Sequence, residues 1–542
     1  MRRLNRTVAA ATIALTILGA TGCTPQRPSS GDAHDTDGEQ GIVLADSQDL
    51  GQYNPVSGYA QLGVSPIYEG LLRPTSPDDT AVPTLVPALA AEAPSSDATA
   101  TTWTVRLRQD VRFSDGSVFD ADDVVATYRA VLDPASASEI AASVQMIDTV
   151  TATDPHTVTF ALRHPYADFP TKLLLGIAPA EKLTGGPASE SELNQHPVGT
   201  GPYLLSELSP TRALFTPNPS YVPTRDRRPP VVPTLTVAHV ADDNARSQMV
   251  ASGDVTGANL PPQLARSLDG RNGLHTVAVR SADWRGVSLP QDNPFTADRA
   301  ARVAMNLAVD RQAMVDHIFA GHGRAASTPM PDLYPGIDVP EPFPHDPVGA
   351  GRLLDSAGWL PGPDGIRVRD GQRAEFTVHH AASDTVRRDL TVAFAADLAK
   401  IGVDVHITSS SWEQMEPIAP HVAILLAGGA EPYSPDSQLY PALHARTDAS
   451  GTFDNPAGWS DPAVDEALDQ ARRSLDPKLR SEFLGKALQA YQDNPTHVML
   501  TFVDHTYTYA DGDYQPVAPI MEPHSHGVEW GPWWSLADWH RK

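Results

Sequence analysis

Short strand-like runs alternate with helical segments along this chain of 542 residues from Gly41 onwards. The apolar run at 41–46 and the alternating run at 103–108 are typical of strands, whereas acidic residues at 120–123 begin a helical segment that Pro134 ends. No sustained repeat interrupts this alternation. Since about 150 residues make one domain, the sequence predicts an α/β protein with mixed sheets, divided into two or three lobes.

The same pattern predicts further elements. Helices are predicted over 298–319, 390–401, 461–474 and 479–492, and strands over 157–162, 235–240, 403–408 and 422–429. Glycine follows the first two helices, at Gly321 and Gly402, which is where helices commonly end. We expect the segment 298–319 to form one long helix.

Residues 1–22 have the pattern of a secretory signal. Three arginines precede an apolar stretch at 8–20, which is too short to span a bilayer as a mature helix. The only cysteine, Cys23, follows at once and ends the sequence Ala-Thr-Gly-Cys. This tail resembles a bacterial lipobox, with Ala20 where leucine is usual, and the resemblance implies lipidation of Cys23. A plain secretory signal with an incidental cysteine is the alternative.

After Cys23, residues 24–40 carry no large apolar side chain, so 23–40 is expected to be a flexible tether.

Composition excludes several classes of function. The net charge of −26 repels phosphate backbones, so no nucleic-acid partner is expected. One cysteine excludes a disulfide framework and a thiolate-bound zinc site. Metalloprotease, nucleophile-elbow and P-loop signatures are absent, so the sequence predicts no enzyme and no cofactor, and a secreted hydrolase is the remote alternative.

An ordered series of motifs covers nearly the whole predicted mature chain. It comprises IYEGLL at 67–72, VPALA at 86–90, WTVRLRQDVRFSDGSVFDADDVVATYRAVLDP at 103–134, HPVGTGPYLL at 196–205, NPSY at 218–221, SGDV at 252–255, ARVAMNLAVDRQAMVDHIFAGHG at 301–323 and DPVGAGRLLDSAGW at 346–359. Together these motifs strongly resemble the family 5 solute-binding proteins of ABC importers, which bind dipeptides, oligopeptides, nickel and related solutes. The resemblance implies a two-lobed periplasmic-binding-protein-like fold of type II, with an extra subdomain and the ligand between the lobes.

The resemblance also implies a division of the chain. Lobe I is expected at 41–258 with a subdomain at 74–194, lobe II at 259–494, and a return to lobe I at 495–542. Gly199 and Gly201 are expected near the hinge, because lobe closure needs positions that absorb backbone rotation. A purely structural role is the alternative for both glycines.

In peptide-binding members of the family, an acid in a loop after an apolar strand takes the α-amino group of the ligand, because a buried ammonium needs an ionic partner. Here the strand at 422–429 precedes Glu431, and Asp436 is the second choice. A solvated loop acid is the alternative. Tyr433 and Trp412 are expected as apolar walls, and Tyr53 and Asn54 lie in a segment that often presents backbone groups to the ligand in the family.

Histidines near the C-terminus suggest a metal alternative. His524 and His526 form an H-x-H pair, and His505 lies upstream. On an extended segment such a pair places both rings on one face, and imidazole suits nickel, copper or zinc. The nickel-binding branch instead tends to grip a metal chelate with arginines from the first lobe, and the segments 135–146 and 172–182 contain none. Surface or capping histidines are the plainer explanation.

We therefore expect a monomeric, extracytoplasmic binding lipoprotein on the outer face of the cell membrane, anchored through Cys23. It would capture a short peptide between its lobes and deliver it to an ABC permease powered by a separate ATPase. A metal chelate is the alternative ligand, and a sensor role is the alternative to import.

Overall fold

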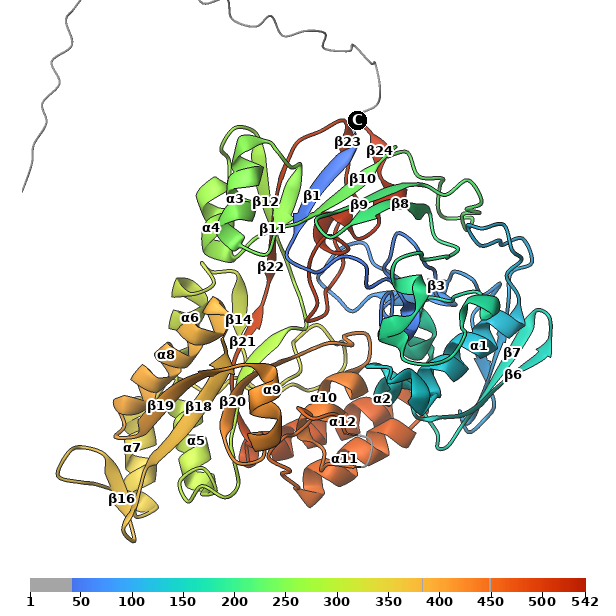
Figure 1. Cartoon of the computed structure of the whole chain (residues 1–542). Coiled ribbons are helices and arrows are strands. Elements are labelled where there is room, and N and C mark those ends of the chain that lie inside the picture. Colours follow the sequence, from blue (N-terminus) through green and yellow to red (C-terminus); the bar gives the residue numbers. More distant parts are fainter. Residues whose placement is uncertain (1–40, 383, 448–449) are drawn as a thin grey trace, which may run out of the picture. The chain divides into compact units, whose positions relative to one another are not determined.

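The computed structural model describes residues 41–382, 384–447 and 450–542 (Figure 1). The predicted signal segment 1–22, Cys23 and the tether 23–40 lie outside the described residues. Within the described part, no helix combines the length and the apolar character needed to cross a membrane.

A seven-stranded sheet forms the first core. Its strand order is β12-β22-β11-β1-β10-β9-β8, with β1 parallel to both β10 and β11. The strands are β1 Ile42–Asp46, β8 Tyr203–Ser209, β9 Arg212–Pro217, β10 Leu235–His239, β11 Gly257–Asn259, β12 Leu274–Val279 and β22 His505–Ala510. Helices α3 Asp243–Ser252 and α4 Pro262–Leu268 lie beside β11 and β12 (Figure 1) and share an apolar cluster with Ala45 and Leu274. The strands predicted at 41–46 and 235–240 are confirmed.

A smaller unit is inserted after β1. Its four-stranded sheet has the order β4-β5-β7-β6, and helix α1 packs on it. The elements are β2 Leu72–Thr75, β3 Thr84–Pro87, β4 Ser95–Ser96, β5 Thr102–Arg106, α1 Ala121–Leu132, α2 Ala141–Val144, β6 Ile147–Asp154 and β7 Thr157–Leu162. Asp120 and Asp123 form a capping box that begins α1, as the acidic run predicted, and Tyr128 buries its ring against Phe160.

A six-stranded sheet of order β14-β21-β13-β20-β18-β19 forms the second core. Its strands are β13 Trp284–Ser288, β14 Gly323–Ala325, β18 Glu375–Ala381, β19 Asp404–Ser410, β20 Ala423–Gly428 and β21 His497–Val503. Ala423 and Leu425 face one apolar cluster, whereas Ile424 and Leu426 face another. Helices cover both faces, which explains why β20 is a continuous apolar run.

The helices of this second core fall into two groups. Helices α5 Arg299–Ala308, α7 Pro347–Ser356 and α8 Thr385–Ala399 contribute to the cluster around Leu425, and α6 Arg311–His317 packs beside β14 and β21. Helices α10 Pro435–Leu443, α11 Pro462–Arg473 and α12 Pro477–Asp493 contribute to the cluster around Leu426. The short elements are α9 Trp412–Met415, β15 Leu360–Pro361, β16 Arg367–Arg369 and β17 Gln372–Arg373.

The single long helix predicted over 298–319 is wrong, because the chain breaks between α5 and α6. Val309 is extended, with φ −78° and ψ 127°. Asp310 then caps α6, accepting a hydrogen bond from the Ala313 N–H at 3.0 Å, while its own N–H donates to Asp397 at 2.9 Å. An aspartate that satisfies free backbone groups competes with helix continuation.

Sheet membership locates the chain crossings between the two cores. Strand β12 belongs to the first sheet and β13 to the second, so the chain crosses at 280–283 and returns at Asp504, between β21 and β22. We call the part at 41–279 and 505–542 lobe I and the part at 284–503 lobe II. Both crossings come later than the predicted boundaries at 258 and 494, because β12 completes the first sheet by pairing with β22, α4 packs against these two strands, and β21 still belongs to the second sheet.

The C-terminal segment closes lobe I. Strands β23 Tyr514–Gln515 and β24 His540–Arg541 pair with each other. Trp530, Trp533 and Trp539 are buried in the lobe I core, and Trp533 packs edge-on against Tyr507. The tail therefore supplies part of the inner wall of lobe I.

Candidate ligand-binding site

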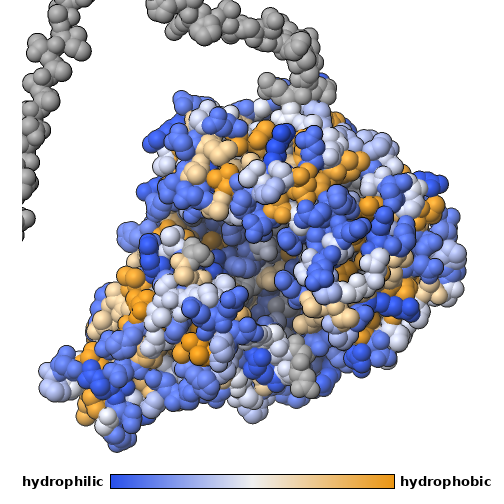
Figure 2. Space-filling view, in the orientation of Figure 1, coloured by the Kyte–Doolittle hydropathy of each residue, from blue (hydrophilic) through white to orange (hydrophobic). Residues whose placement is uncertain are grey.

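Both lobes direct the carboxyl ends of their parallel strands into loops. In lobe I, β1 ends at Asp46 and β10 at His239, and in lobe II, β18 ends at Ala381 and β20 at Gly428. Ligands of open α/β sheets bind beyond such ends. The space-filling view is hollowed where the two lobes meet (Figure 2).

A cavity of about 310 Å³ lies in lobe I beyond the end of β1. Its walls come from residues 46–66, from β8 to β10 and from residues 525–537, and many of the lining side chains are aromatic. They include Tyr53, Tyr59, Tyr203, Phe215, Trp530, Trp533 and Trp534. This volume is at the lower end of the range of about 300–1,000 Å³ that is usual for small-molecule sites.

One carboxylate in this cavity has no cationic partner. Glu529 lines the cavity and accepts a short hydrogen bond from the Tyr59 hydroxyl, and it forms no ion pair with any described residue. Burial raises the pKa of Glu529 to about 7, and the nearby charge of Asp46 acts in the same direction. The side chain is half-buried because the cavity admits solvent to it.

The local backbone brings Glu529 to the end of β1. Asp46 accepts hydrogen bonds from the N–H groups of Gln48 at 3.2 Å and Val528 at 2.9 Å. Gly527 has φ +130°, and a Cβ there would lie 2.7 Å from an Asp46 carboxylate oxygen. A glycine is therefore needed where the C-terminal segment passes β1.

Tyr53 and Asn54, both predicted as ligand contacts, are placed differently. Tyr53 lines the cavity, packs edge-on against Tyr59, and burial raises the pKa of its hydroxyl. Asn54 is buried, accepts a hydrogen bond from the Val56 N–H and donates one to the Ala188 carbonyl. Asn54 therefore shapes the segment that carries Tyr53 and does not line the cavity.

A second, small cavity adjoins the first at Gln61 and Leu62 and reaches lobe II. Glu431 and Tyr433 line it, together with Lys172 from lobe I. Glu431 forms an ion pair with the buried Lys172, and the Ser437 hydroxyl donates to the same carboxylate oxygen at 3.3 Å. The hydroxyl of Tyr433 is buried without a hydrogen-bond partner among the described residues.

Asp436 is also paired within the protein. It lies in the first turn of α10 and accepts two hydrogen bonds from Arg472, at 3.0 and 2.8 Å. The Tyr166 hydroxyl of lobe I donates to it at 3.1 Å. Binding of a ligand ammonium by Glu431 or Asp436, as predicted, would require these ion pairs to open.

Trp412 lies at the start of α9, outside both cavities. Its ring packs edge-on against Phe453, with ring centroids 5.1 Å apart, and the Arg387 guanidinium lies 5.2 Å from the Trp412 ring. Burial and the neighbouring Arg285 lower the pKa of Arg387 to about 10. The Nε atoms of both arginines are buried without a partner among the described residues.

The three histidines of the metal alternative come together at the chain crossing. His505 lies between Glu522 at 2.7 Å and Asp283 at 3.2 Å, while His524 contacts the other oxygen of Asp283 at 2.8 Å. The ring of His526 lies 4.6 Å from that of His505. Carboxylates therefore already occupy ring nitrogens of His505 and His524 that a metal ion would need.

Charge is balanced within this crossing. Burial alone would lower the pKa of His505, but its hydrogen bonds to Asp283 and Glu522 raise it to about 9. Burial, together with the charges of His505 and His524, lowers the pKa of His526 to about 3. Arg285 pairs with Asp283 and holds the pKa of that buried carboxyl well below its usual value, against the effect of burial. The group is an ion-pair network that joins the two lobes.

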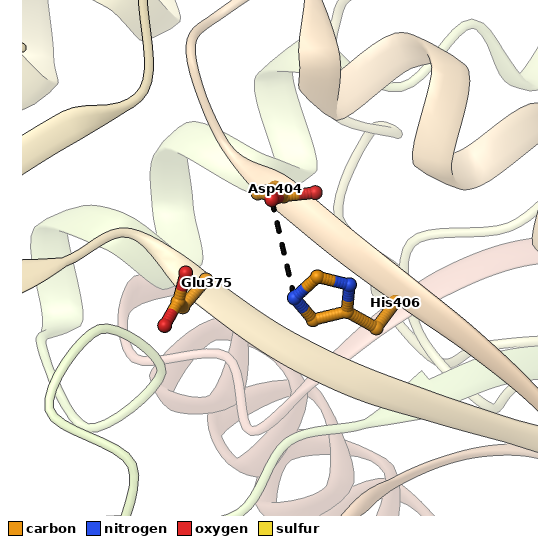
Figure 3. A group of neighbouring side chains, drawn as sticks. All are labelled: Glu375, Asp404 and His406. Atoms are coloured by element: carbon orange, nitrogen blue, oxygen red, sulfur yellow. Dashed lines mark ion pairs between the residues drawn. The ribbon is translucent and has the colours of Figure 1, made fainter. Parts of the chain in front are cut away.

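A different trio has the spacing of metal ligands. Glu375 on β18 and Asp404 and His406 on β19 offer ligand atoms within 4.8 Å of one another (Figure 3). They lie at the amino ends of these strands, opposite the loops that face lobe I. Arg373 already pairs with Glu375 at 3.0 Å. The trio lies apart from the site described above.

Gly199 and Gly201, the predicted hinge residues, lie within lobe I. A Cβ on Gly199 would lie 2.2 Å from the Ile67 carbonyl oxygen, and the Gly201 N–H donates to the same oxygen at 2.8 Å. Close backbone packing explains both glycines. The chain crossings are elsewhere, at 280–283 and Asp504, so the hinge role stays a prediction.

Sequence reasoning missed three residues of this site. Glu529 and Tyr59 were not singled out, although Glu529 lies in the tryptophan-rich segment VEWGPWW. The prediction for the segment 172–182 rested on its lack of arginine and did not include Lys172. The chain has only six lysines, which is a signal for Lys172. An acidic residue among tryptophans is a signal for Glu529.

Comparison with known proteins places this geometry in a family. The sequence profile of the bacterial extracellular solute-binding proteins, family 5 (middle part), matches residues 84–450. The chain belongs to family 5 of the bacterial extracellular solute-binding proteins. The predicted two-lobed α/β fold is confirmed, and relatives of the chain include proteins named as oligopeptide-binding and glutathione-binding.

Named relatives cover most of the chain. Protein XP55 of Streptomyces lividans is 39% identical over 513 residues, which is 94% of this chain and 92% of that protein. The oligopeptide-binding protein AppA of Bacillus subtilis is 26% identical over 416 residues, covering 74% of this chain and 75% of AppA. The structure of NikZ from Campylobacter jejuni with Ni(L-His) has a TM-score of 0.79 at 23% identity, covering 92% of this chain and 99% of NikZ.

Proposed function

We propose that this family 5 protein captures a short peptide between its lobes and delivers it to an ABC permease powered by a separate ATPase. The observation that carries the proposal is a carboxylate without a cationic partner in the aromatic cavity of lobe I. Glu529 lines that cavity and forms no ion pair with any described residue, whereas Arg285 and Arg387 of lobe II are buried and pair with Asp283 and Asp384. An unpaired carboxylate suits a solute with a positive group, such as the ammonium of a peptide, because buried charges need opposite partners.

The mechanism is lobe closure. The ligand bridges both walls and shifts the population towards the closed form that the permease recognises. Several contacts among the described residues also join lobe I to lobe II outside this cavity, including Lys172 with Glu431, Arg480 with Asp168, and Tyr166 with Asp436. No bond in the ligand is made or broken.

The same proposal includes anchoring on the outer face of the cell membrane through lipidated Cys23. It is supported by the lipobox-like sequence at 20–23 and the extracellular character of the family. Mass spectrometry of Cys23→Ala and of the unchanged protein from cell membranes tests it. Lipid mass on the unchanged protein alone is expected, and two masses that differ only by the sulfur atom of the cysteine would contradict it.

A metal chelate is the second candidate, because the similarly folded NikZ was solved with Ni(L-His), and because Arg285 and Arg387 could donate to the carboxylates of a chelating ligand if their pairs with Asp283 and Asp384 open. Calorimetry with di- to pentapeptides, and with nickel in the presence and absence of histidine, separates the two. Heat from peptides alone is the expected result. Heat from nickel or its histidine complex, and none from any peptide, would replace the peptide proposal with the chelate one.

A further inference from the structure

The lobe I cavity combines features that select for positive charge. Its carboxylate, Glu529, is held by the Tyr59 hydroxyl and forms no ion pair among the described residues. Aromatic side chains surround it, including Tyr53 and Trp530. A carboxylate within aromatic walls is a common way to bind an ammonium or guanidinium group, through an ion pair combined with cation–π contact.

The other charged groups around the cavity leave this carboxylate unpaired. Arg227 also lines the cavity, but its Nε donates to Asp538 at 3.1 Å and its Nη2 to Ser535 at 3.0 Å. Asp46 adds a second negative charge, and its oxygens accept from backbone N–H groups. His526 lines the cavity as a neutral ring, because its pKa is lowered to about 3 by burial and by its histidine neighbours. The local balance is therefore negative.

Unused hydrogen-bonding capacity points in the same direction. The indole N–H of Trp533, a residue that is 3% exposed and lines the cavity, has no acceptor among the described residues. A buried polar group without a partner costs free energy until something fills the gap. A ligand whose charged end reaches Glu529 could also supply an acceptor to Trp533.

We propose that this cavity is a cation subsite, in which Glu529 binds the ammonium or guanidinium group of the captured peptide. The inference rests on the proposed function and names its substrate class: peptides that carry a positive group able to enter lobe I. That group has two possible sources, the N-terminal ammonium or a lysine or arginine side chain. Glu431 and Asp436, already neutralised by Lys172 and Arg472, are not needed for this contact.

Calorimetry on the purified protein tests the subsite and identifies the source of the cation. Ala-Lys-Ala and Ala-Arg-Ala are compared with Ala-norleucine-Ala, each with a free and with an acetylated N-terminus. If side chains enter, the lysine and arginine peptides bind at least tenfold more tightly than the norleucine peptide. If the terminus enters, acetylation weakens binding at least tenfold. Affinities that are equal within twofold across the set would overturn the proposal while leaving peptide capture intact.

Variants assign the effect to the carboxylate. Glu529→Gln keeps the shape and removes the charge, so it is expected to abolish the tenfold preference, whereas Glu529→Asp retains part of it. Glu207→Gln removes one charge from an exposed position on β8 of the same lobe and is the matched control. An unchanged preference in Glu529→Gln would overturn the assignment. If Glu529→Gln does not fold, the peptide comparison on the unchanged protein and the charge preference of Glu529→Asp still test whether Glu529 binds the cation.

A probe smaller than a peptide separates the two proposals. Tryptophan fluorescence is titrated with n-butylammonium and with n-butanol, since Trp530, Trp533 and Trp534 line the cavity. A response to the cation that is at least tenfold stronger than to the alcohol, and that is lost in Glu529→Gln, supports the subsite even if no peptide binds. Equal responses to both compounds would contradict it.

Discussion

The carboxylates on the lobe I side and the lobe II side of the cleft differ in whether they form ion pairs within the protein. In lobe II, Glu431 and Asp436 each meet a cation of the protein, Lys172 and Arg472. In lobe I, the only hydrogen bond that Glu529 forms with a described side chain is the one from the Tyr59 hydroxyl, and Glu529 lines an open cavity. A carboxylate that is already paired holds the protein together, whereas an unpaired one at a cavity is available to a ligand. The acid found by motif and the acid left free by the fold are therefore different residues.

The largest expected effect tests whether the lobe II acids are structural. Arg472→Leu leaves Asp436 buried without its cation, which should lower the free energy of unfolding by about 3 kcal/mol. Chemical denaturation measures this loss. Arg473→Leu removes a neighbouring, more exposed arginine and is the control, expected to cost under about 1 kcal/mol. Equal effects of the two substitutions would show that the ion pair between Asp436 and Arg472 stabilises the fold no more than an exposed ion pair does.

The ion-pair network at the chain crossing gives a second test, because its contribution to stability depends on pH. His505 has an ordinary pKa of 6.5 and a pKa of about 9 in the folded protein. The protonated form therefore stabilises the fold fully below pH 6.5, and this contribution is lost as the pH rises through 9. We expect a loss of about 1–3 kcal/mol between those values. Stability curves measured by denaturation at several pH values check it.

Variants make the pH prediction specific. His505→Gln should remove most of the loss between pH 6.5 and 9. His421→Gln changes an exposed histidine that pairs with Asp292, and it should leave the loss in place. A pH profile of His505→Gln that matches the unchanged protein would rule out this origin.

A double-mutant cycle measures the contact between the walls. Lys172→Met and Glu431→Gln, alone and together, should give a coupling energy of about 1 kcal/mol, because Lys172 is buried and Glu431 is one quarter exposed. A coupling near zero would mean that the pair does not hold the lobes together. In that case Glu431 would be free for the ligand role predicted from the sequence.

The smallest expected effect concerns Glu529 without ligand. Its pKa is raised from 4.5 to about 7, so the fold is most stable, as far as this group is concerned, below pH 4.5 and loses that stability as the pH rises through 7. Glu529→Gln should therefore raise stability by about 1 kcal/mol at pH 8 and leave it nearly unchanged at pH 4.5. Thermal unfolding at both pH values measures the difference. A destabilised variant at pH 8 would show that the carboxylate is part of the scaffold.

Local patterns predicted much of the fold. The sequence predicted the acidic start of α1, the apolar run of β20 and the strands at 41–46 and 235–240. Helix capping and hydrophobic patterning act over a few residues, so they can be recognised in the sequence. The break at Val309 was not, because it depends on Asp397 in another helix meeting Asp310. Of the candidate site, Tyr53 was placed at the cavity, whereas Glu529 and Tyr59 were missed because they are 470 residues apart.

The sequence by itself determined the family and the two-lobed α/β class, because ordered motifs and short-range periodicity are properties of the chain alone. Only the tertiary structure decided which carboxylates are free. Glu431 looks like Glu529 in sequence, but Lys172, 259 residues away, neutralises the one and no described cation reaches the other. Ion pairing is a matter of distance in space, and the folding of lobe against lobe sets those distances.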